Sequence, residues 1–196
     1  MIITIATQDY VGTAHFIATT LARRRANAGR DVLLLSQKIL PEHASQNQEK
    51  ENQAWFATEM KAGASSFKLN ADQLEQELAD IQSVHRDIVV DLPQATQASS
   101  LCALAASSFA VFMLKTADWH ANSESLLIQQ MKAARSANAK VPVLLIVDEA
   151  TSPAGRAIIA TLTASVTDLR IQALATDQQA TLAYLYRTIF QTWRAQ

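Results

Sequence analysis

The chain has 196 residues, with 17 Lys and Arg against 18 Asp and Glu, and a formal net charge of −1 at pH 7. A chain of this length can bury about 70% of its unfolded surface in one core, so it needs no metal or disulfide to fold. We therefore expect a single domain over residues 1–196. The near-neutral charge gives no global field for nucleic acid or acidic lipid, so such a partner would need a local basic patch.

Cysteine and histidine usage argues against the commonest covalent and metal-based sites. The one cysteine, Cys102, has no second cysteine for an internal disulfide. The four histidines, at positions 15, 43, 85 and 120, show no metal-ligand spacing with it. No G-x-S-x-G segment marks a nucleophile, and we expect Cys102 to pack in the apolar segment "SSLCALAASS". The sequence therefore predicts no metal site and no catalytic residue.

Short apolar runs rich in Ile, Val and Leu alternate with longer stretches of helical period. This pattern is typical of strands that are buried on both faces by crossover helices. The predicted strands are Ile2–Ala6, Val32–Ser36, Ser66–Leu69 (an edge strand), Asp87–Asp91, Phe109–Leu114, Val143–Val147 and Leu169–Ala173. The predicted helices cover about residues 14–28, 71–83, 94–106, 120–138, 153–165 and 176–194. We therefore predict an α/β protein with an open, mostly parallel sheet of about seven strands and helices on both faces.

In such a sheet, ligands bind at the carboxyl ends of the strands. We expect function in the loops that follow Ala6, Ser36, Asp91, Leu114 and Val147. The only long polar interruption, "SQKILPEHASQNQEKENQAWF", follows the second predicted strand. Its Gln, Asn, Glu and Lys content predicts a surface excursion, which could be helical from Ala44, rather than a part of the core.

Three segments carry a family resemblance over nearly the whole chain. They are "MIITIATQDYVGTAHFIATTLARRRANAGRDVLLLS", "RDIVVDLPQATQASSLCALAASSFAVFMLK" and "VPVLLIVDEATSP". In order and spacing they resemble three parts of the ParA/MinD-type deviant Walker ATPases. These parts are the first strand with its phosphate loop and helix, the Walker B strand with an Asp-x-Pro turn, and the strand that ends beside the nucleotide base. The resemblance implies a P-loop NTPase-like, three-layer α/β/α fold of the SIMIBI class.

The phosphate loop of that family reads K-G-G-V-G-K-T-[ST], and each residue type in it has a role. Glycines let successive N–H groups cradle phosphate, the second Lys contacts the terminal phosphates, and the Thr hydroxyl ligates Mg²⁺. The first Lys reaches the nucleotide of a dimer partner. Matching Val11-Gly12 to the V-G of this motif places Gln8 and Thr13 at the two lysines and Ala14 at the Mg²⁺ ligand. Both lysine charges are then absent.

A second alignment register leads to the same result. A gapless match from Ala6 places Asp9 and Ala14 at the lysines and His15 at the ligand position. The second strand also lacks the acidic residue of the family, so that Asp91 alone survives among the acidic positions. Losing one interaction that stabilises a transferring phosphate commonly costs about 10³ in rate. We therefore interpret the loop as a degenerate Walker A motif in which ATP hydrolysis is lost.

Weak nucleotide binding stays open, because the helix after the loop still presents free N–H groups and a positive dipole end. The resemblance implies ATP or ADP with Mg²⁺ as weak cofactor candidates. The cofactor-binding residues that it implies are Gly12, Thr13, Ala14, His15 and Asp91. Two of them have structural alternatives. Asp91 could begin a turn and cap the next helix, and His15 could be partly buried and bonded to a neighbouring loop.

The same loop offers a protein interface. Tyr10 and Val11 place bulky side chains where the family has glycines, and an exposed aromatic residue at a junction is a good interface anchor. We predict a homodimer through these two residues, together with contacts to a partner adaptor protein. By resemblance, the predicted location is the bacterial cytoplasm, at the nucleoid or a cell pole.

The resemblance predicts a ParA-like partition or positioning function, for plasmid or chromosomal DNA, that depends on dimer and partner contacts. One alternative is an accessory MinD/ParA-like subunit that localises a secretion, pilus or cellulose-export machine. The other is an unorthodox P-loop ATPase with Thr13, His15 and Asp91 as ligands. The pair Asp148-Glu149 also follows a predicted strand, where it either faces a ligand or leads into a helix.

Basic residues form two groups along the sequence. Arg23, Arg24, Arg25 and Arg30 surround the end of the first helix, where cations complement the helix dipole. A weak, nonspecific DNA patch could be formed by Lys132, Arg135, Lys140, Arg187 and Arg194.

The last helix carries an apolar stripe. Its residues Leu182, Leu185, Ile189 and Trp193 recur at helical spacing. Membrane-binding amphipathic helices are rich in cations, whereas only Arg187 and Arg194 are cationic here. We therefore predict that this helix packs against the sheet.

Overall fold

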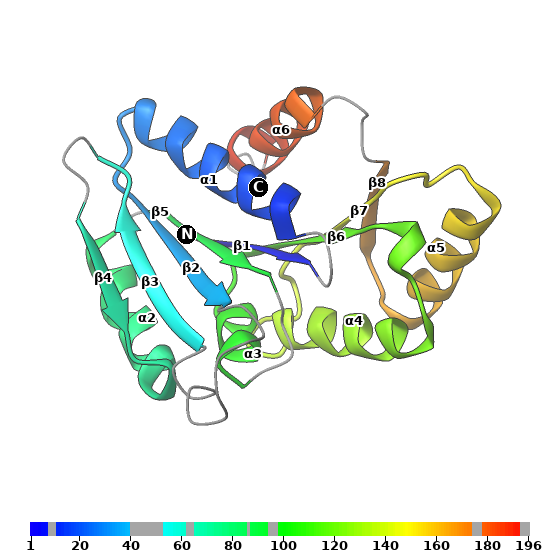
Figure 1. Ribbon diagram of the computed structural model, residues 1–196, viewed down its shortest axis with the longest axis horizontal. Coiled ribbons are helices and arrows are strands. Elements are labelled where there is room, and N and C mark those ends of the chain that lie inside the picture. Colours follow the sequence, from blue (N-terminus) through cyan, green and yellow to red (C-terminus); the bar gives the residue numbers. More distant parts are fainter. Residues whose placement is uncertain are drawn as a thin grey trace.

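The computed structural model describes residues 1–7, 11–39, 53–61, 65–85, 87–93, 98–173 and 178–192. Its centre is an eight-stranded sheet with the order β4-β3-β2-β5-β1-β6-β7-β8. The strands are β1 (Ile2–Thr7), β2 (Val32–Ile39), β3 (Gln53–Glu59), β4 (Ser66–Leu69), β5 (Asp87–Leu92), β6 (Phe109–Leu114), β7 (Val143–Val147) and β8 (Leu169–Ala173). Neighbouring strands are parallel except in the pairs β2–β3 and β3–β4. The predicted α/β fold with a mostly parallel sheet is confirmed (Figure 1).

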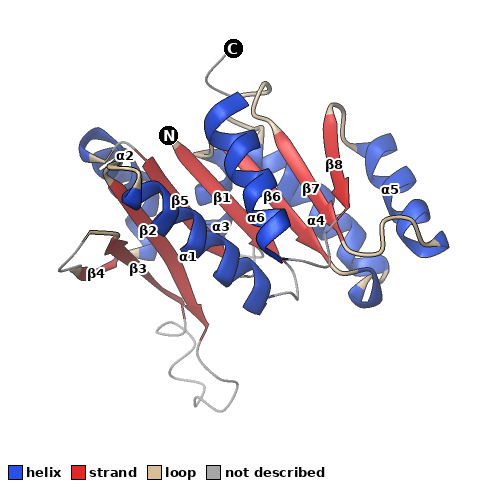
Figure 2. Cartoon of the chain, turned by 90° about the horizontal axis from the view of Figure 1, so that it is seen from above, coloured by secondary structure: helices blue, strands red, loops and turns tan. Residues whose placement is uncertain are grey.

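Helices cover both faces of the sheet (Figures 1 and 2). The α-helices of the described residues are α1 (Val11–Asn27), α2 (Leu74–Val84), α3 (Ala98–Ala105), α4 (Ala121–Ala134), α5 (Pro153–Ser165) and α6 (Gln178–Arg187). Short 3-10 helices η2 (Ala71–Gln73) and η3 (Thr116–Asp118) and a π-helix η4 (Thr188–Thr192) complete the list. Residues of α1 and α6 pack on one face, and residues of α2, α3, α4 and α5 pack on the other.

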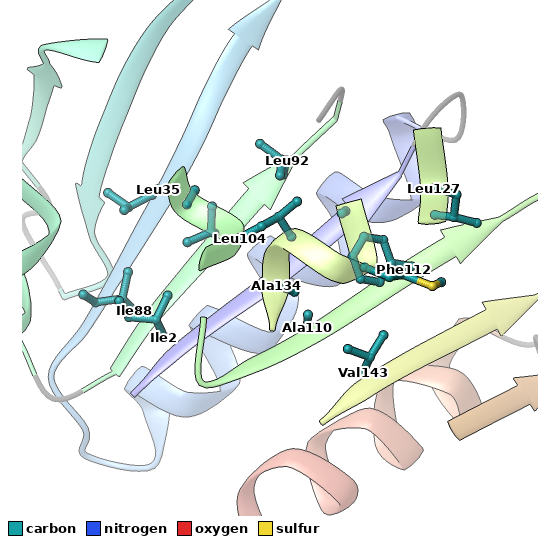
Figure 3. Packing of buried hydrophobic residues seen from close by; sticks show 14 of the residues in the cluster. Ile2, Leu35, Ile88, Leu92, Leu104, Ala110, Phe112, Leu127, Ala134 and Val143 are labelled. Carbon is teal, nitrogen blue, oxygen red and sulfur yellow. The ribbon is translucent and has the colours of Figure 1, made fainter. Parts of the chain in front are cut away.

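The core consists of two apolar layers, one on each side of the sheet. In β1, Ile3 and Ile5 belong to the layer under α1 and α6, whereas Ile2 and Ala6 belong to the opposite layer. Figure 3 shows the second layer, in which Phe112 of β6 lies beside residues of the overlying helices. Because successive strand residues point to opposite faces, a run of apolar residues without alternation fills both layers. This explains why the central strands were readable from the sequence.

The polar stretch after the second predicted strand was partly misinterpreted. Its two ends are strands: β2 continues to Ile39, and β3 begins at Gln53 and pairs with β2 in antiparallel orientation. Trp55 of β3 is fully buried, so this segment does contribute to the core. The error arose because the apolar residues of β3 directly follow a long polar run, and only alternate side chains of this strand are buried. Ala44 lies outside the described residues.

The C-terminal helix packs against the sheet, as predicted. Leu182, Leu185 and Ile189 are buried in the layer that they share with α1. Trp193 lies outside the described residues. Among the helices described, none has the length and apolar character that a membrane span requires.

Candidate functional site at the carboxyl ends of β1 and β5

The chain brings the start of α1 against the carboxyl end of β5. Asp91 lies at this end, in register with Ile5 of β1 on one side and Ser36 of β2 on the other. Helix α1 begins at Val11, shortly after β1, and covers this part of the sheet. The loop after β1 and the end of β5 are therefore neighbours in the fold, at the edge where α/β proteins bind their ligands.

His15 and Asp91 form the central contact of the site. The Nδ1 atom of His15 lies 2.6 Å from Oδ2 of Asp91. The Asp91 side chain is 5% exposed, whereas the His15 side chain is 58% exposed. When Asp91 is ionised its carboxylate can only accept, so Nδ1 of His15 is then the donor of this hydrogen bond. This leaves Nε2 as the other polar atom of a half-exposed ring.

The environment of Asp91 disfavours its charge. Burial raises the pKa of the Asp91 carboxyl above its ordinary value, and the hydrogen bond from His15 lowers it in part. Oδ1 is buried and has no hydrogen-bond partner among the described residues. One oxygen of this buried carboxylate therefore has a hydrogen-bond donor, and the other has none among the described residues. Groups held in this way cluster at functional sites.

In the first turns of α1, small side chains face the sheet, and the solvent side of the helix is open. Thr13 is buried, and Ala14 is fully buried in the apolar layer. A Cβ added to Gly12 would meet nothing within 4 Å, and Phe16 is 37% exposed. Tyr10 lies outside the described residues, as do Gln8 and Asp9. Val11 forms the first residue of α1, and its side chain is not described.

Of the predicted cofactor set, the structure thus brings Gly12, Thr13, Ala14 and His15 onto the first turns of α1, with Asp91 beside them. The His15–Asp91 bond itself could not be read from the sequence. Both residues were singled out separately, because one begins a helix and the other ends a strand. The loop after β1 and helix α1 contain no lysine, since the first lysine of the chain is Lys38.

The ends of β6 and β7 are joined by a second set of contacts. Oδ1 of Asp148 accepts a hydrogen bond of 2.6 Å from the backbone N–H of Thr116. Glu149 has a φ of 40°, and a Cβ on Gly155 would lie 2.4 Å from its carbonyl oxygen. Glycine is therefore required at 155 so that α5 can pack against this loop. The sequence had singled out Asp148 and Glu149 but gave no sign that Thr116 and Gly155 complete the arrangement.

The predicted basic patch is divided by the fold. Lys132 lies on α4 and Arg135 directly follows this helix, whereas Arg187 ends α6, on the opposite face of the sheet (Figure 2). The guanidinium of Arg135 donates to the carbonyl oxygens of Val141, Thr167 and Asp168. It is therefore used within the fold. Lys140 is exposed before β7, and Arg194 lies outside the described residues.

Metal-ligating side chains do not gather elsewhere. Within the described part of the chain, no three His, Cys, Asp or Glu residues are grouped so as to hold a metal ion. The thiol of Cys102 lies 4.0 Å from a carboxylate oxygen of Glu75. Burial, followed by the charge of Glu75, raises the pKa of this thiol, which opposes formation of a reactive thiolate.

Strand order, crossover helices and the helix start beside β5 define a P-loop NTPase-like α/β/α fold, the fold shared by ParA-, MinD- and McdA-type proteins. No protein-family model matches the chain, and no curated protein matches it. Solved structures do match. Cobyrinic acid a,c-diamide synthase from Mycobacterium smegmatis, with bound ADP and magnesium, has a TM-score of 0.60 at 13% identity, over 100% of this chain and 96% of that chain.

Two further structures show the same fold. Apo McdA from Cyanthece has a TM-score of 0.51 at 12% identity, over 94% of this chain and 90% of that chain. The MinC:MinD cell division protein complex from Aquifex aeolicus has a TM-score of 0.52 at 11% identity, over 94% and 85%. At these identities the comparison establishes the fold, and the chemistry has to be argued from the residues present.

Proposed function

We propose that this protein is a ParA/MinD-fold positioning or partition protein that acts as one α/β domain, through contacts with a second copy and an adaptor protein, with little or no nucleotide turnover. The observation that carries the proposal is the 2.6 Å bond between His15 and Asp91. The bond occupies the one acidic side chain that the family resemblance assigns to phosphate chemistry.

The residues present do not fit a nucleotide with its magnesium ion. A carboxylate that serves a metal–phosphate centre must offer an oxygen to the metal or its water. Oδ2 of Asp91 is bound to His15, and Oδ1 is buried. At the start of α1, Ala14 has no polar side-chain atom, and the chain has no lysine before Lys38. The terminal phosphates would therefore lack both their cation and their metal ligand.

The surface of the first turns of α1 supports a contact function. Gly12, His15 and Phe16 are exposed there, and nothing in the described fold restricts access to Gly12. Glycine in a helix is less stable than alanine. A helical glycine that the packing of the fold does not require therefore suggests close approach by another molecule. MinD of the compared complex is bound to a protein, MinC. By analogy, the proposed cargo is plasmid or chromosomal DNA, reached through the adaptor.

Turnover and self-association together test the proposal. ATP hydrolysis is measured for the native protein and for Asp91→Ala, and sedimentation velocity is recorded with and without ATP and Mg²⁺. We expect no turnover in either protein and a dimer that does not respond to nucleotide. We expect Tyr10→Ala and Phe16→Ser to weaken the dimer, with Tyr10→Phe as the matched control that keeps the ring. Turnover that Asp91→Ala abolishes would instead favour the unorthodox ATPase.

A further inference from the structure

A second charged cluster lies at the amino end of β5, whereas His15 lies at the carboxyl end of this strand. Asp87 is the first residue of β5, and Arg25 lies in the last turn of α1. Nε of Arg25 is 2.7 Å from Oδ2 of Asp87, and Nε of Arg30 is 3.6 Å from the same oxygen. The ten residues between His15 and Arg25 span about 15 Å of helix. The cluster is therefore separate from the candidate site described above.

The Arg25–Asp87 pair is buried, Arg30 beside it is partly exposed, and the cluster carries excess positive charge. The Arg25 and Asp87 side chains are 7% and 3% exposed. Two guanidinium groups face the Asp87 carboxylate, and the Met1 amino group lies within electrostatic reach of all three, so positive charge is in excess. Buried charges are normally paired, because removing an unpaired ion from water costs several kcal/mol. An anion beside Arg30 would complete this balance.

Hydrogen bonding leads to the same conclusion. Nη2 of Arg25 and Nε of Arg30 are buried and have no hydrogen-bond acceptor among the described residues. The 3.6 Å separation from Asp87 is too long for a hydrogen bond. Buried donors without partners point to a water or an ion. Excess positive charge favours an anion.

Within the part of the chain that the structure describes, the neighbouring groups do not supply an acceptor to these two donors. The ring of Phe190 lies 4.5 Å from the Arg25 guanidinium, which it holds in place but to which it offers no oxygen. The carboxylate of Asp31 is bound by Lys61 at 2.8 Å and also lies 3.5 Å from His85. Arg30 is 26% exposed, so it is the member of the cluster that solvent can reach.

We propose that Arg25 and Arg30 form a binding site for a small oxyanion, a phosphate or a carboxylate, which enters beside Arg30 and accepts hydrogen bonds from both guanidinium groups. Planar guanidinium forks match the spacing of two oxygens in such anions. The site goes beyond the positioning function proposed above and does not depend on it, because it shares no residue with the His15–Asp91 site.

Thermal unfolding of the full chain tests the site. Sodium phosphate and sodium acetate are added separately at millimolar concentration, and sodium chloride at matched ionic strength is the reference. At ten times the dissociation constant, we expect the melting temperature to rise by about 3 °C or more over the chloride reference. The rise should saturate. The two anions show whether a tetrahedral or a planar group is preferred.

Matched variants locate the effect. Arg30→Gln should abolish the rise, whereas Arg23→Gln, which removes an exposed arginine from the same helix, should keep it. Arg30→Lys keeps the charge but not the fork, and should weaken binding. Nitrogen-detected NMR of the Arg25 and Arg30 Nε–H groups should show both moving with one dissociation constant. Equal temperature shifts in Arg30→Gln and Arg23→Gln, meaning an adventitious ion only, would overturn the proposal, as would no shift in the native protein.

Discussion

The imidazole of His15 and the carboxylate of Asp91 lie 2.6 Å apart although 76 residues separate them in the sequence. Their bond ties the start of α1 to the end of β5, at the edge of the sheet where related folds hold phosphate. A histidine whose Nδ1 is held by a buried carboxylate is fixed in tautomer and orientation. The pair therefore joins these two elements by an internal contact between side chains.

Removing the charge of Asp91 should stabilise the protein near neutral pH. Burial raises the pKa of Asp91 above its ordinary value of 3.8. The fold therefore favours the protonated form, so the contribution of Asp91 to stability is full below that value and is lost as pH rises through the raised pKa. We expect Asp91→Asn to gain on the order of 1 kcal/mol in the free energy of unfolding at about pH 7.

The same gain should shrink as the pH falls. Denaturant unfolding of both proteins between about pH 7 and pH 3 measures it. Below the ordinary pKa, native Asp91 is protonated in the folded and unfolded states alike, so the two proteins should approach equal stability. A gain that is the same at every pH would show that charge burial at Asp91 is not its cause.

Removing the His15 side chain should lower the free energy of unfolding. His15→Ala leaves the buried Asp91 without its hydrogen-bond donor, and an unsatisfied buried acceptor costs about 1–3 kcal/mol. We expect this loss at about pH 7 and a smaller one in acid, where Asp91 protonates. Arg23→Ala, at an exposed position of the same helix, is the matched control. Equal losses in the two variants would argue that the His15–Asp91 bond contributes nothing specific.

Gly12 and Gly155 should respond to alanine in opposite directions. An added Cβ meets nothing within 4 Å at Gly12, so Gly12→Ala should stabilise the fold by up to about 1 kcal/mol. At Gly155 the Cβ would lie 2.4 Å from the carbonyl oxygen of Glu149, so Gly155→Ala should destabilise it. Thermal unfolding measures both changes.

Self-association adds a second measurement for Gly12. If a protein partner approaches this residue closely, Gly12→Ala should weaken the dimer in sedimentation while it raises the melting temperature. A gain in stability with unchanged association would remove Gly12 from the proposed contact surface.

Breaking the Arg25–Asp87 pair should be costly. Both side chains are buried, and loss of Arg25 leaves the Asp87 carboxylate without its 2.7 Å hydrogen bond and with Arg30, at 3.6 Å, as its remaining cation. Removing one member of a buried pair typically costs about 3–5 kcal/mol. We expect Arg25→Met to lose this amount in denaturant unfolding. Arg24→Met, which removes an exposed hydrogen bond to Gln179, should lose far less. Comparable losses would indicate that the pair is not a major contributor to stability.

Much of the fold followed from apolar periodicity. Runs such as Val143–Val147 fill both core layers, and the predicted and observed bounds of this strand agree. Strand β3 was missed because Trp55 follows a long polar run in the sequence. Its burial depends on the pairing of β3 with β2. Local hydrophobic patterns therefore predict a strand well where helices cover both of its faces, and poorly where only one face is covered.

The site was predictable only in part. Asp91 was expected at a strand end and His15 in the first turns of a helix, because element boundaries fix such positions. Their contact depends on the placement of α1 across the sheet, which no local pattern contains. Similarly, the arginines around the end of α1 suggested an interaction with the helix dipole, whereas Arg25 forms a buried ion pair with Asp87. Charge partners that are distant in sequence require the tertiary structure.

The central claim is that the His15–Asp91 site does not hold a nucleoside triphosphate. Isothermal titration calorimetry of the native protein with ATP or ADP in the presence of Mg²⁺ tests this most directly. We predict no saturable heat at micromolar to millimolar nucleotide. Tight, Mg²⁺-dependent binding that Asp91→Ala abolishes and Arg30→Gln preserves would contradict the account, because it would show Asp91 serving a bound nucleotide.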